Sequence, residues 1–316
     1  MAENERIMHF ANFNITYGVD ENPMLEHFED IIFPAFCSGY KRGKEDERPL
    51  FYFDGVDIKN IDNEYVLVGN YIKDTEYDVH TTVQDGKLVS TPAQVPTAPY
   101  SRFVIFLKNH RMVLVRNESQ SPDIRSFQAT VRKMLSNYIR QTNRTIKEKG
   151  QKLPNALVNI VDIPLQKDIE EVLKDVSKIN WLKFRFFPLN NDINPIPIAE
   201  DIDKEMKKIG SKHAHVQFIS PDSKPEVKAL IRQSAGIAAM TLEVSDANGN
   251  RTKIKEDQFT SNKRIAFVRD ILPEDDLYIV EQAKKDTVIT LVSDANHVLY
   301  EKFKVVVEKL KTHGLK

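Results

Sequence analysis

A long amphipathic segment, residues 121–149, separates two parts of the chain that differ in sequence pattern. Its apolar residues fall on one side of a helix drawn at about 100° per residue. These residues are Ile124, Phe127, Val131, Met134, Leu135, Tyr138 and Ile146. Ser121 or Asp123 can cap the first turn, and Gly150 and Pro154 follow the last one. The segment predicts one long helix, residues 121–150, that connects two domains, residues 1–120 and 151–316.

The first of these domains is predicted to be rich in β-strands. Runs of β-branched and aromatic residues, which favour strands, occur at residues 6–17, 50–58, 65–83 and 102–116. Within the last run, Asn109-His110 separates two apolar stretches and predicts the turn of a hairpin. Residues 90–99 contain three prolines and predict an extended linker on the surface.

The second domain alternates between strand and helix patterns. Residues 156–161, 180–187, 213–219 and 238–244 have the pattern of strands, and residues 166–176 and 224–233 have that of helices. With the acidic helix at residues 199–209 treated as an insertion, the order is β-α-β-β-α-β, which predicts a ferredoxin-like, split βαβ sheet. Further strands are predicted at residues 251–254, 264–268 and 288–292, and a terminal helix after Ser293-Asp294. The fold class predicted for the chain is α+β.

Composition excludes several classes of protein. Hydrophobic residues make up 41% of the chain, which is enough for a core. The single cysteine, Cys37, excludes disulfide scaffolds and cysteine-based zinc sites. No apolar run approaches the roughly 18 residues of a membrane helix, and the N-terminus lacks the order of a signal peptide. We therefore expect a cytoplasmic protein without a membrane partner.

The positive charge of the chain is concentrated on the long helix. The chain has 45 Lys+Arg and 46 Asp+Glu, a net charge of −1. Residues 124–152 hold eight basic residues against Glu148 alone, so this segment carries +7 and the other 287 residues carry −8. An arc of about 120° opposite the apolar side holds Arg125, Arg132, Lys133, Arg140, Arg144 and Lys147. A row of cations along one element is typical of phosphate binding.

The same row of cations has an ordinary structural interpretation. An amphipathic helix needs a polar face, and acidic segments such as residues 168–175 or 200–205 are available to pair with this one. Docking on an acidic protein, or on a second copy of the chain, is a third interpretation. The sequence leaves all three open.

A second basic surface is predicted in the strand at residues 180–187. Alternation places Leu182, Phe184 and Phe186 on one face, and Trp181, Lys183 and Arg185 on the other. Aromatic rings that stack on bases, beside cations that bind phosphates, are what single-stranded nucleic acid requires. A covering by another part of the chain is the alternative, since a lone tryptophan more often packs in a core.

One strand presents a candidate metal site. Asp74, Glu76, Asp78 and His80 alternate along residues 65–83, so their side chains share a face. Three carboxylates and an imidazole are suitable ligands for Mg²⁺ or Mn²⁺ in phosphodiester cleavage. A solvated outer strand, whose charges discourage edge pairing, is the simpler interpretation.

No nucleotide-binding or hydrolase motif is present. The sequence has no GxxxxGK[ST], GxGxxG, GxSxG or HExxH, and it has only 11 glycines. It therefore predicts no cofactor and favours a protein that is not an enzyme.

Residues 103–116, followed by Ser121-Pro122-Asp123-Ile124-Arg125-Ser126-Phe127, resemble uncharacterised bacterial proteins encoded near mobile elements and phage-defence genes. The resemblance covers about a tenth of the chain and carries no catalytic residue. The resemblance transfers no function; it only adds a component of a bacterial phage-defence or mobile-element system to the alternatives.

The function that these features favour is non-enzymatic binding of nucleic acid, DNA or RNA. Two alternatives remain, an oligomeric or protein-interaction component that docks through the basic helix and a metal-dependent nuclease that uses Asp74, Glu76, Asp78 and His80. The expected nucleic-acid contacts are Arg125, Arg132, Lys133, Arg140, Arg144, Lys147, Trp181, Lys183 and Arg185.

Overall fold

A computed structural model describes residues 4–44, 47–164, 166–188, 197–234, 236–255, 258 and 263–313. Before the long helix lie β1 (Asn4–Tyr17), β2 (Asn22–Pro23), η1 (Met24–His27), η2 (Phe28–Ile32), α1 (Phe33–Phe36), β3 (Leu50–Ile61), β4 (Glu64–Gln84), β5 (Lys87–Thr97), β6 (Tyr100–Phe106) and β7 (Arg111–Arg116). Next come α2 (Ile124–Thr145), η3 (Lys149–Gln151), β8 (Ala156–Asp162), α3 (Gln166–Val172), β9 (Lys178–Phe186), α4 (Pro197–Ile209), β10 (Ala214–Ile219), α5 (Lys224–Gln233), β11 (Ala238–Ser245) and β12 (Arg251–Lys255). The chain closes with β13 (Lys263–Phe267), η5 (Pro273–Asp275), α6 (Asp276–Lys284), α7 (Thr287–Thr290) and α8 (Asp294–His313).

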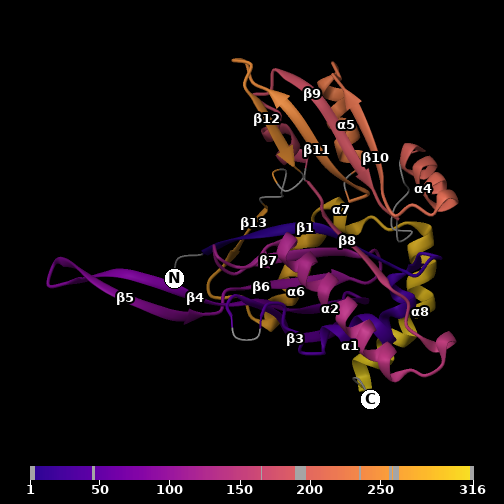
Figure 1. Cartoon of the computed structure of the whole chain (residues 1–316), viewed down its shortest axis with the longest axis horizontal. Helices are drawn as coiled ribbons and strands as arrows, with labels where there is room; N and C mark the ends of the chain where they lie inside the picture. The colour runs from indigo at the N-terminus through magenta and orange to yellow at the C-terminus, as the bar shows by residue number, and fades with distance from the viewer. Residues whose placement is uncertain are drawn as a thin grey trace.

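The strands form two antiparallel sheets, so the predicted α+β class is confirmed (Figure 1). The large sheet has the order β13-β1-β7-β6-β4-β3, with β2 and β8 also paired to β1 and β5 paired to β4. The small sheet has the order β10-β9-β11-β12. The domain boundaries at residues 120 and 150 stay a prediction, although β8, β13 and the last three helices lie with the large sheet.

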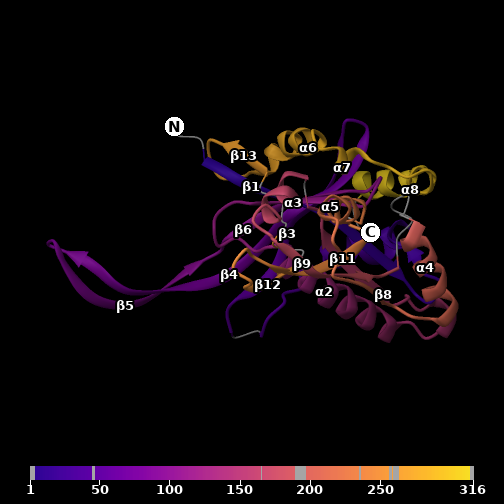
Figure 2. The same ribbon diagram turned by 90° about the horizontal axis from the view of Figure 1, so that it is seen from above.

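The large sheet is buried on both faces. On one face, α2 and α8 pack over a core that includes Phe13, Phe103 and Phe127. Figure 2 shows α2 and α6 on opposite sides of the strands. On the other face, α6 packs over Phe10 and Val113. The predicted amphipathic helix is thus confirmed as α2, with its Asp123 side chain accepting from the Ser126 backbone N–H at 2.8 Å. In the described part of the chain, no helix is long and apolar enough to span a membrane.

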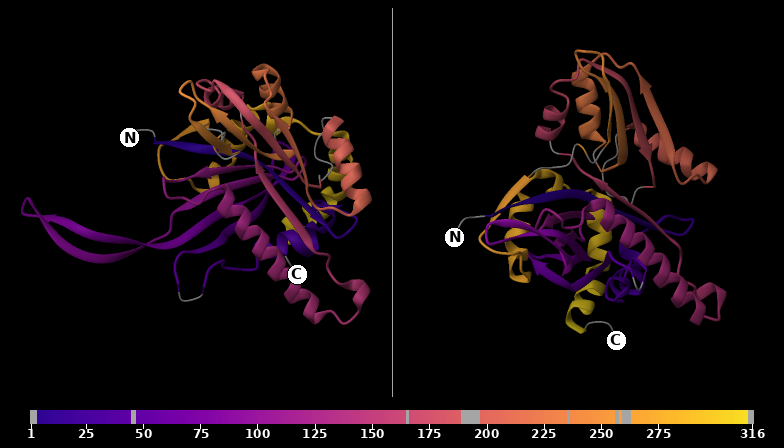
Figure 3. Two further views of the ribbon diagram at one scale, coloured as in Figure 1. Left: turned by 45° about the horizontal axis from the view of Figure 1, so that its top comes forward. Right: turned by 60° about the vertical axis from the view of Figure 1, so that its left-hand side comes forward.

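The small sheet is covered on one face only. Leu182, Phe184 and Met240 pack with residues of α3 and α5 on that face. The opposite face carries the alternate residues of each strand, among them Trp181, Lys183 and Arg185 of β9. Figure 3 shows the small sheet above the large sheet, with the helices of the small sheet on one of its sides.

The ferredoxin-like order predicted for the second half is wrong. The strand at residues 156–161 is β8, which pairs with β1 in the large sheet, and β12 takes an edge of the small sheet instead. A ferredoxin-like sheet would have the strand at residues 156–161 at its centre, whereas the central strands of the small sheet are β9 and β11. Periodicity identified the strand but not its partner, because pairing depends on edges that are distant in sequence.

Two other predictions are also wrong. Residues 90–99, predicted to be a linker, belong largely to β5, which forms a long two-stranded hairpin with the end of β4 (Figure 1). Its prolines are tolerated because β5 is an edge strand with one side unpaired. Residues 288–292, predicted to be a strand, overlap α7.

A buried ion pair fixes α6 to the centre of the large sheet. The guanidinium of Arg102 on β6 donates to both carboxylate oxygens of Asp276, at 2.8 and 2.7 Å, and both side chains are at most 2% exposed. Lys59 Nζ lies 2.7 Å from the same carboxylate, and Arg102 also donates to Asn70 Oδ1 at 3.1 Å. Each buried donor of this group therefore finds an acceptor, which offsets the cost of desolvation.

We expect Asp276→Ala to destabilise the fold by about 3–5 kcal/mol, because it leaves the Arg102 guanidinium buried and unpaired. Glu5→Ala removes a carboxylate from the exposed pair with Arg264 and should cost less than about 1 kcal/mol. Urea unfolding of both variants and the parent measures the difference. Equal unfolding midpoints for the two variants would contradict the claim that Asp276 stabilises the fold by pairing with the buried Arg102.

His9 on β1 is a second buried group, and its charge state affects stability. Burial, followed by the nearby Arg116 guanidinium, lowers the pKa of His9 to about 4, against the opposing effect of Asp123. The folded protein therefore keeps the ring neutral between about pH 6.5 and 4, while the unfolded chain takes up a proton there. Stability is lost as the pH falls through this window.

We expect His9→Gln to reduce this acid loss by up to about 3 kcal/mol, because the variant has no imidazole to protonate in the unfolded chain. The measurement is the free energy of unfolding at pH 7 and at pH 4.5. His80→Gln, on the exposed β4–β5 hairpin, controls for the loss of an imidazole. Parallel profiles for parent and His9→Gln would refute the prediction.

Candidate nucleic-acid interface

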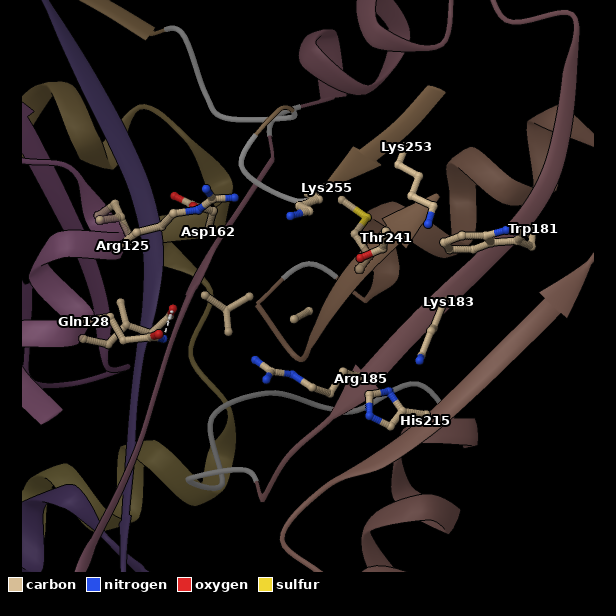
Figure 4. Close-up of a pocket in the computed structure, with 15 residues that line it drawn as sticks. Arg125, Gln128, Asp162, Trp181, Lys183, Arg185, His215, Thr241, Lys253 and Lys255 are labelled. Carbon is tan, nitrogen blue, oxygen red and sulfur yellow. Dashed lines mark hydrogen bonds between the residues drawn. The ribbon is translucent and has the colours of Figure 1, made fainter. Parts of the chain in front are cut away.

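A cleft of about 490 Å³ lies between the uncovered face of the small sheet and the large sheet. On one wall are residues of β9, β10, β11 and β12, and on the other are the start of α2 and the end of β8 (Figure 4). Its lining includes Trp181, Lys183, Arg185, His215, Thr241, Lys253 and Lys255 from the small sheet, and Arg125, Gln128 and Asp162 from the opposite wall. The predicted basic helix and the predicted basic strand therefore meet at one cavity.

Positive charge dominates the cleft. Five Lys or Arg side chains line it against one carboxylate, Asp162, which is 6% exposed. Lys253 Nζ lies 6.0 Å from the centroid of the Trp181 ring. On the opposite wall, Gln128 Nε2 donates to the Ile160 carbonyl at 2.6 Å, which holds α2 against β8. Cations and a single aromatic ring on a concave surface suit an anionic ligand with planar groups.

Two histidines, His213 and His215, have pKa values that are lowered by burial and by nearby cations. The pKa of His215 is lowered by burial first and then by Lys183 and Arg185. The pKa of His213 is lowered by burial first and then by Arg185, His215, Arg132 and Lys212. Because Arg132 belongs to α2 and Arg185 to β9, cations of both the helix and the small sheet act on the His213 imidazole.

The cations of α2 face solvent. All six side chains of the predicted row are exposed. Five of them, from Arg125 to Arg144, lie on α2, and Lys147 follows its end, since the helix stops at Thr145 and does not extend to residue 150 as predicted. Within the described residues, no acidic side chain forms an ion pair with Arg132, Lys133, Arg140, Arg144 or Lys147. Arg132 instead donates to the Val158 carbonyl at 3.1 Å, and Arg140 to Asn137 Oδ1 at 3.0 Å.

The acidic segments considered as intramolecular partners pair elsewhere. In α4, Asp201, Asp203 and Glu205 lie beside Lys204, Lys207 and Lys208 of the same helix. Glu170 of α3 lies 3.7 Å from Arg232 of α5, and the side chain of Asp168 lies outside the described residues. Four described carboxylates of these segments, Asp201, Asp203, Glu205 and Glu170, are thus paired with cations outside α2.

Lys253 and Lys255 are not among the contacts predicted from the sequence. Both lie on β12, and its basic residues alternate with Thr252 and the buried Ile254. That alternation already indicated one polar face, but only the pairing of β12 with β11 places this face beside Trp181. Of the predicted contacts, Arg125, Trp181, Lys183 and Arg185 line the cleft, whereas the remaining α2 cations lie outside it.

The candidate metal ligands lie away from this cleft, on the β4–β5 hairpin. Asp74 Oδ1 lies 3.2 Å from Arg48 Nε, Glu76 Oε1 lies 2.7 Å from Arg48 Nη1, and Asp78 Oδ1 accepts from Gln94 at 3.1 Å. Glu76, Asp78 and His80 are exposed. Among the described residues, no three His, Cys, Asp or Glu side chains are grouped to hold a metal ion. The four residues share a strand but do not converge on a common centre.

Side chains of β1 hold the small sheet in place. Asn12 Nδ2 donates to the Gly236 carbonyl at 2.7 Å, and Asn14 Nδ2 donates to the Pro188 carbonyl at 2.7 Å. Gly236 has a φ of +77°, and a Cβ there would lie 2.6 Å from Arg111 Nη1 and 3.2 Å from the Asn12 Cβ. Position 236 therefore favours glycine for two reasons: its backbone has a positive φ, and a side chain would lie close to Arg111 and Asn12.

We expect Gly236→Ala to destabilise the protein by about 2–5 kcal/mol, since left-handed backbone strain adds to overpacking. Gly249→Ala is the matched control: its φ is +83°, but nothing lies within 4 Å of the new Cβ, so only the strain of about 1–2 kcal/mol applies. Urea denaturation compares the two. A smaller loss for Gly236→Ala than for Gly249→Ala would show that the contact is not tight.

Comparison of the chain with protein-family models, with curated proteins and with solved structures finds no match. The geometry and charge of the cleft and of α2 therefore carry the functional proposal.

Proposed function

We propose that this protein binds nucleic acid along a surface that runs from the exposed cations of α2 into the cleft beside the small sheet. The observation that carries the proposal is the union of two separate basic surfaces at one cavity, with Arg125 on one wall and Lys183, Arg185, Lys253 and Lys255 on the other. The phosphate backbone is the ligand that matches an extended series of cations, because its charges repeat along its length.

Three cations of α2, Arg132, Lys133 and Arg140, are suited to phosphate contacts because they are exposed. In the described structure, Arg132, Lys133 and Arg140 have no acidic partner. Concentrating like charges without counterions is unfavourable, and an incoming polyanion removes that repulsion. After burial, nearby cations contribute to the lowered pKa values of His213 and of His215, and His215 lines the cleft.

For the biological setting we propose a cytoplasmic location, which is consistent with a nucleic-acid ligand. A role in bacterial phage defence or mobile elements is proposed from the sequence resemblance alone. An acidic protein, or a second copy of the chain, remains the alternative partner for α2. The nuclease alternative has no specific support from the β4–β5 hairpin, where Arg48 lies between Asp74 and Glu76.

Salt dependence tests the electrostatic part of the proposal. We expect the affinity for a 20-nucleotide oligonucleotide to fall steeply with salt, and Arg132→Gln combined with Lys133→Gln to reduce the slope of log K against log salt by about 1.4–1.8. Fluorescence anisotropy of a labelled strand measures both quantities.

A matched control removes two cations from another surface. Lys302 and Lys309 of α8 lie near Glu26 and Glu29, so Lys302→Gln with Lys309→Gln makes the same change of charge away from the cleft. It should leave the slope unchanged. No detectable binding of DNA or RNA at low salt, or equal slopes for both double variants, would contradict the proposal.

A further inference from the structure

The uncovered face of the small sheet is an ordered array of polar side chains around one aromatic ring. Strand register places Trp181 beside Ile219 of β10 and Glu243 of β11, and Glu243 lies opposite Lys253 of β12. The adjacent row contains Gln217, Lys183, Thr241 and Lys255. Lys183 and Lys253 therefore lie near the Trp181 ring on the same face, although its direct cross-strand neighbours are Ile219 and Glu243.

Trp181 is half-buried and lines the cleft, so its ring is not part of the core. In Figure 4 the ring lies on the small-sheet wall with Lys253 and Lys183 near it, and Arg125 lies on the opposite wall. An indole at the wall of an open cavity presents a surface for stacking, and the neighbouring ammonium groups lie where phosphates flank a stacked base.

The dimensions of the cleft discriminate between forms of nucleic acid. A volume of about 490 Å³ is on the scale of a small ligand, not of a double helix. Bases within a duplex are stacked on each other and do not offer a free face to a protein ring. Unpaired bases do offer such a face, and single strands are bound by aromatic and basic surfaces of this kind.

We infer that the cleft binds single-stranded nucleic acid, with one base stacked on Trp181 and its phosphates beside Lys183, Lys253 and Lys255. This inference rests on the proposed function, and it adds the form of the nucleic acid and the position of the base. The cations of α2 then hold the strand where it leaves the cleft past Arg125.

Intrinsic fluorescence tests the stacking directly, because Trp181 is the only tryptophan of the chain. The intact protein is titrated with a 20-nucleotide oligo-dT, with oligo-U of the same length, with the dT·dA duplex and with dTMP. We expect a single strand, DNA or RNA, to quench Trp181 emission and to bind at least tenfold more tightly than the duplex and dTMP.

Variants separate stacking from charge. Anisotropy of a labelled oligo-dT should show a loss of about 5- to 150-fold for Trp181→Ala, with partial recovery in Trp181→Phe. Tyr52→Ala is the matched control, since Lys41 lies 5.0 Å from the Tyr52 ring centroid but outside the cleft, and it should not change the affinity. Thermal unfolding of each variant verifies that the fold is retained.

Three results would overturn the inference, and a fourth would also overturn the proposed function. If a labelled strand binds but neither Trp181 emission nor the affinity of Trp181→Ala changes, the inference fails and the proposed function stands. Equal affinity for duplex and single strand also overturns it, and so does tight binding of dTMP, which would indicate a site for a mononucleotide. If no nucleic acid binds at all, the proposed function fails with it.

Discussion

The hydrogen bonds of β1 organise this molecule. Its first residues pair with β13, its middle with β7 and its last seven with β8, so one strand joins segments that lie more than 250 residues apart in sequence. The same strand holds the small sheet through the side chains of Asn12 and Asn14. Because β8 ends beside β1 at Asp162, this pairing also forms one wall of the cleft.

Burial of the large sheet on both faces determines which surfaces stay available for a ligand. Helices α2 and α8 cover one face and α6 the other, so the large sheet presents backbone and side chains mainly at its edges. The small sheet has helices on one face only, which leaves the polar face of β9 and β12 open. The exposed side of α2 and this open face are thus the two surfaces that can share a ligand.

Electrostatics gives the cleft its chemical character. Many carboxylates of the chain have local partners, as Glu5 has in Arg264 and Asp203 has in Lys207. Among the described residues, Arg132, Lys133, Arg140 and Arg144 of α2 have no acidic partner. A net charge near zero conceals this separation. The separation matters because screening limits electrostatic attraction to about a Debye length, so that a ligand responds to the local charge of a surface and not to the sum over the chain.

The sequence by itself determined the local features of the site: the amphipathic α2, the hairpin of β6 and β7, the terminal helix α8, and the side of β9 on which Trp181, Lys183 and Arg185 lie. These follow from periodicity, which depends on neighbours within one or two turns. Tertiary structure alone decided that β8 leaves the small sheet for β1, that residues 90–99 extend a hairpin, and that Lys253 and Lys255 reach Trp181. The physical reason is that a strand's hydrogen-bonding edges are chemically alike, so its partner is selected by the packing of the whole chain.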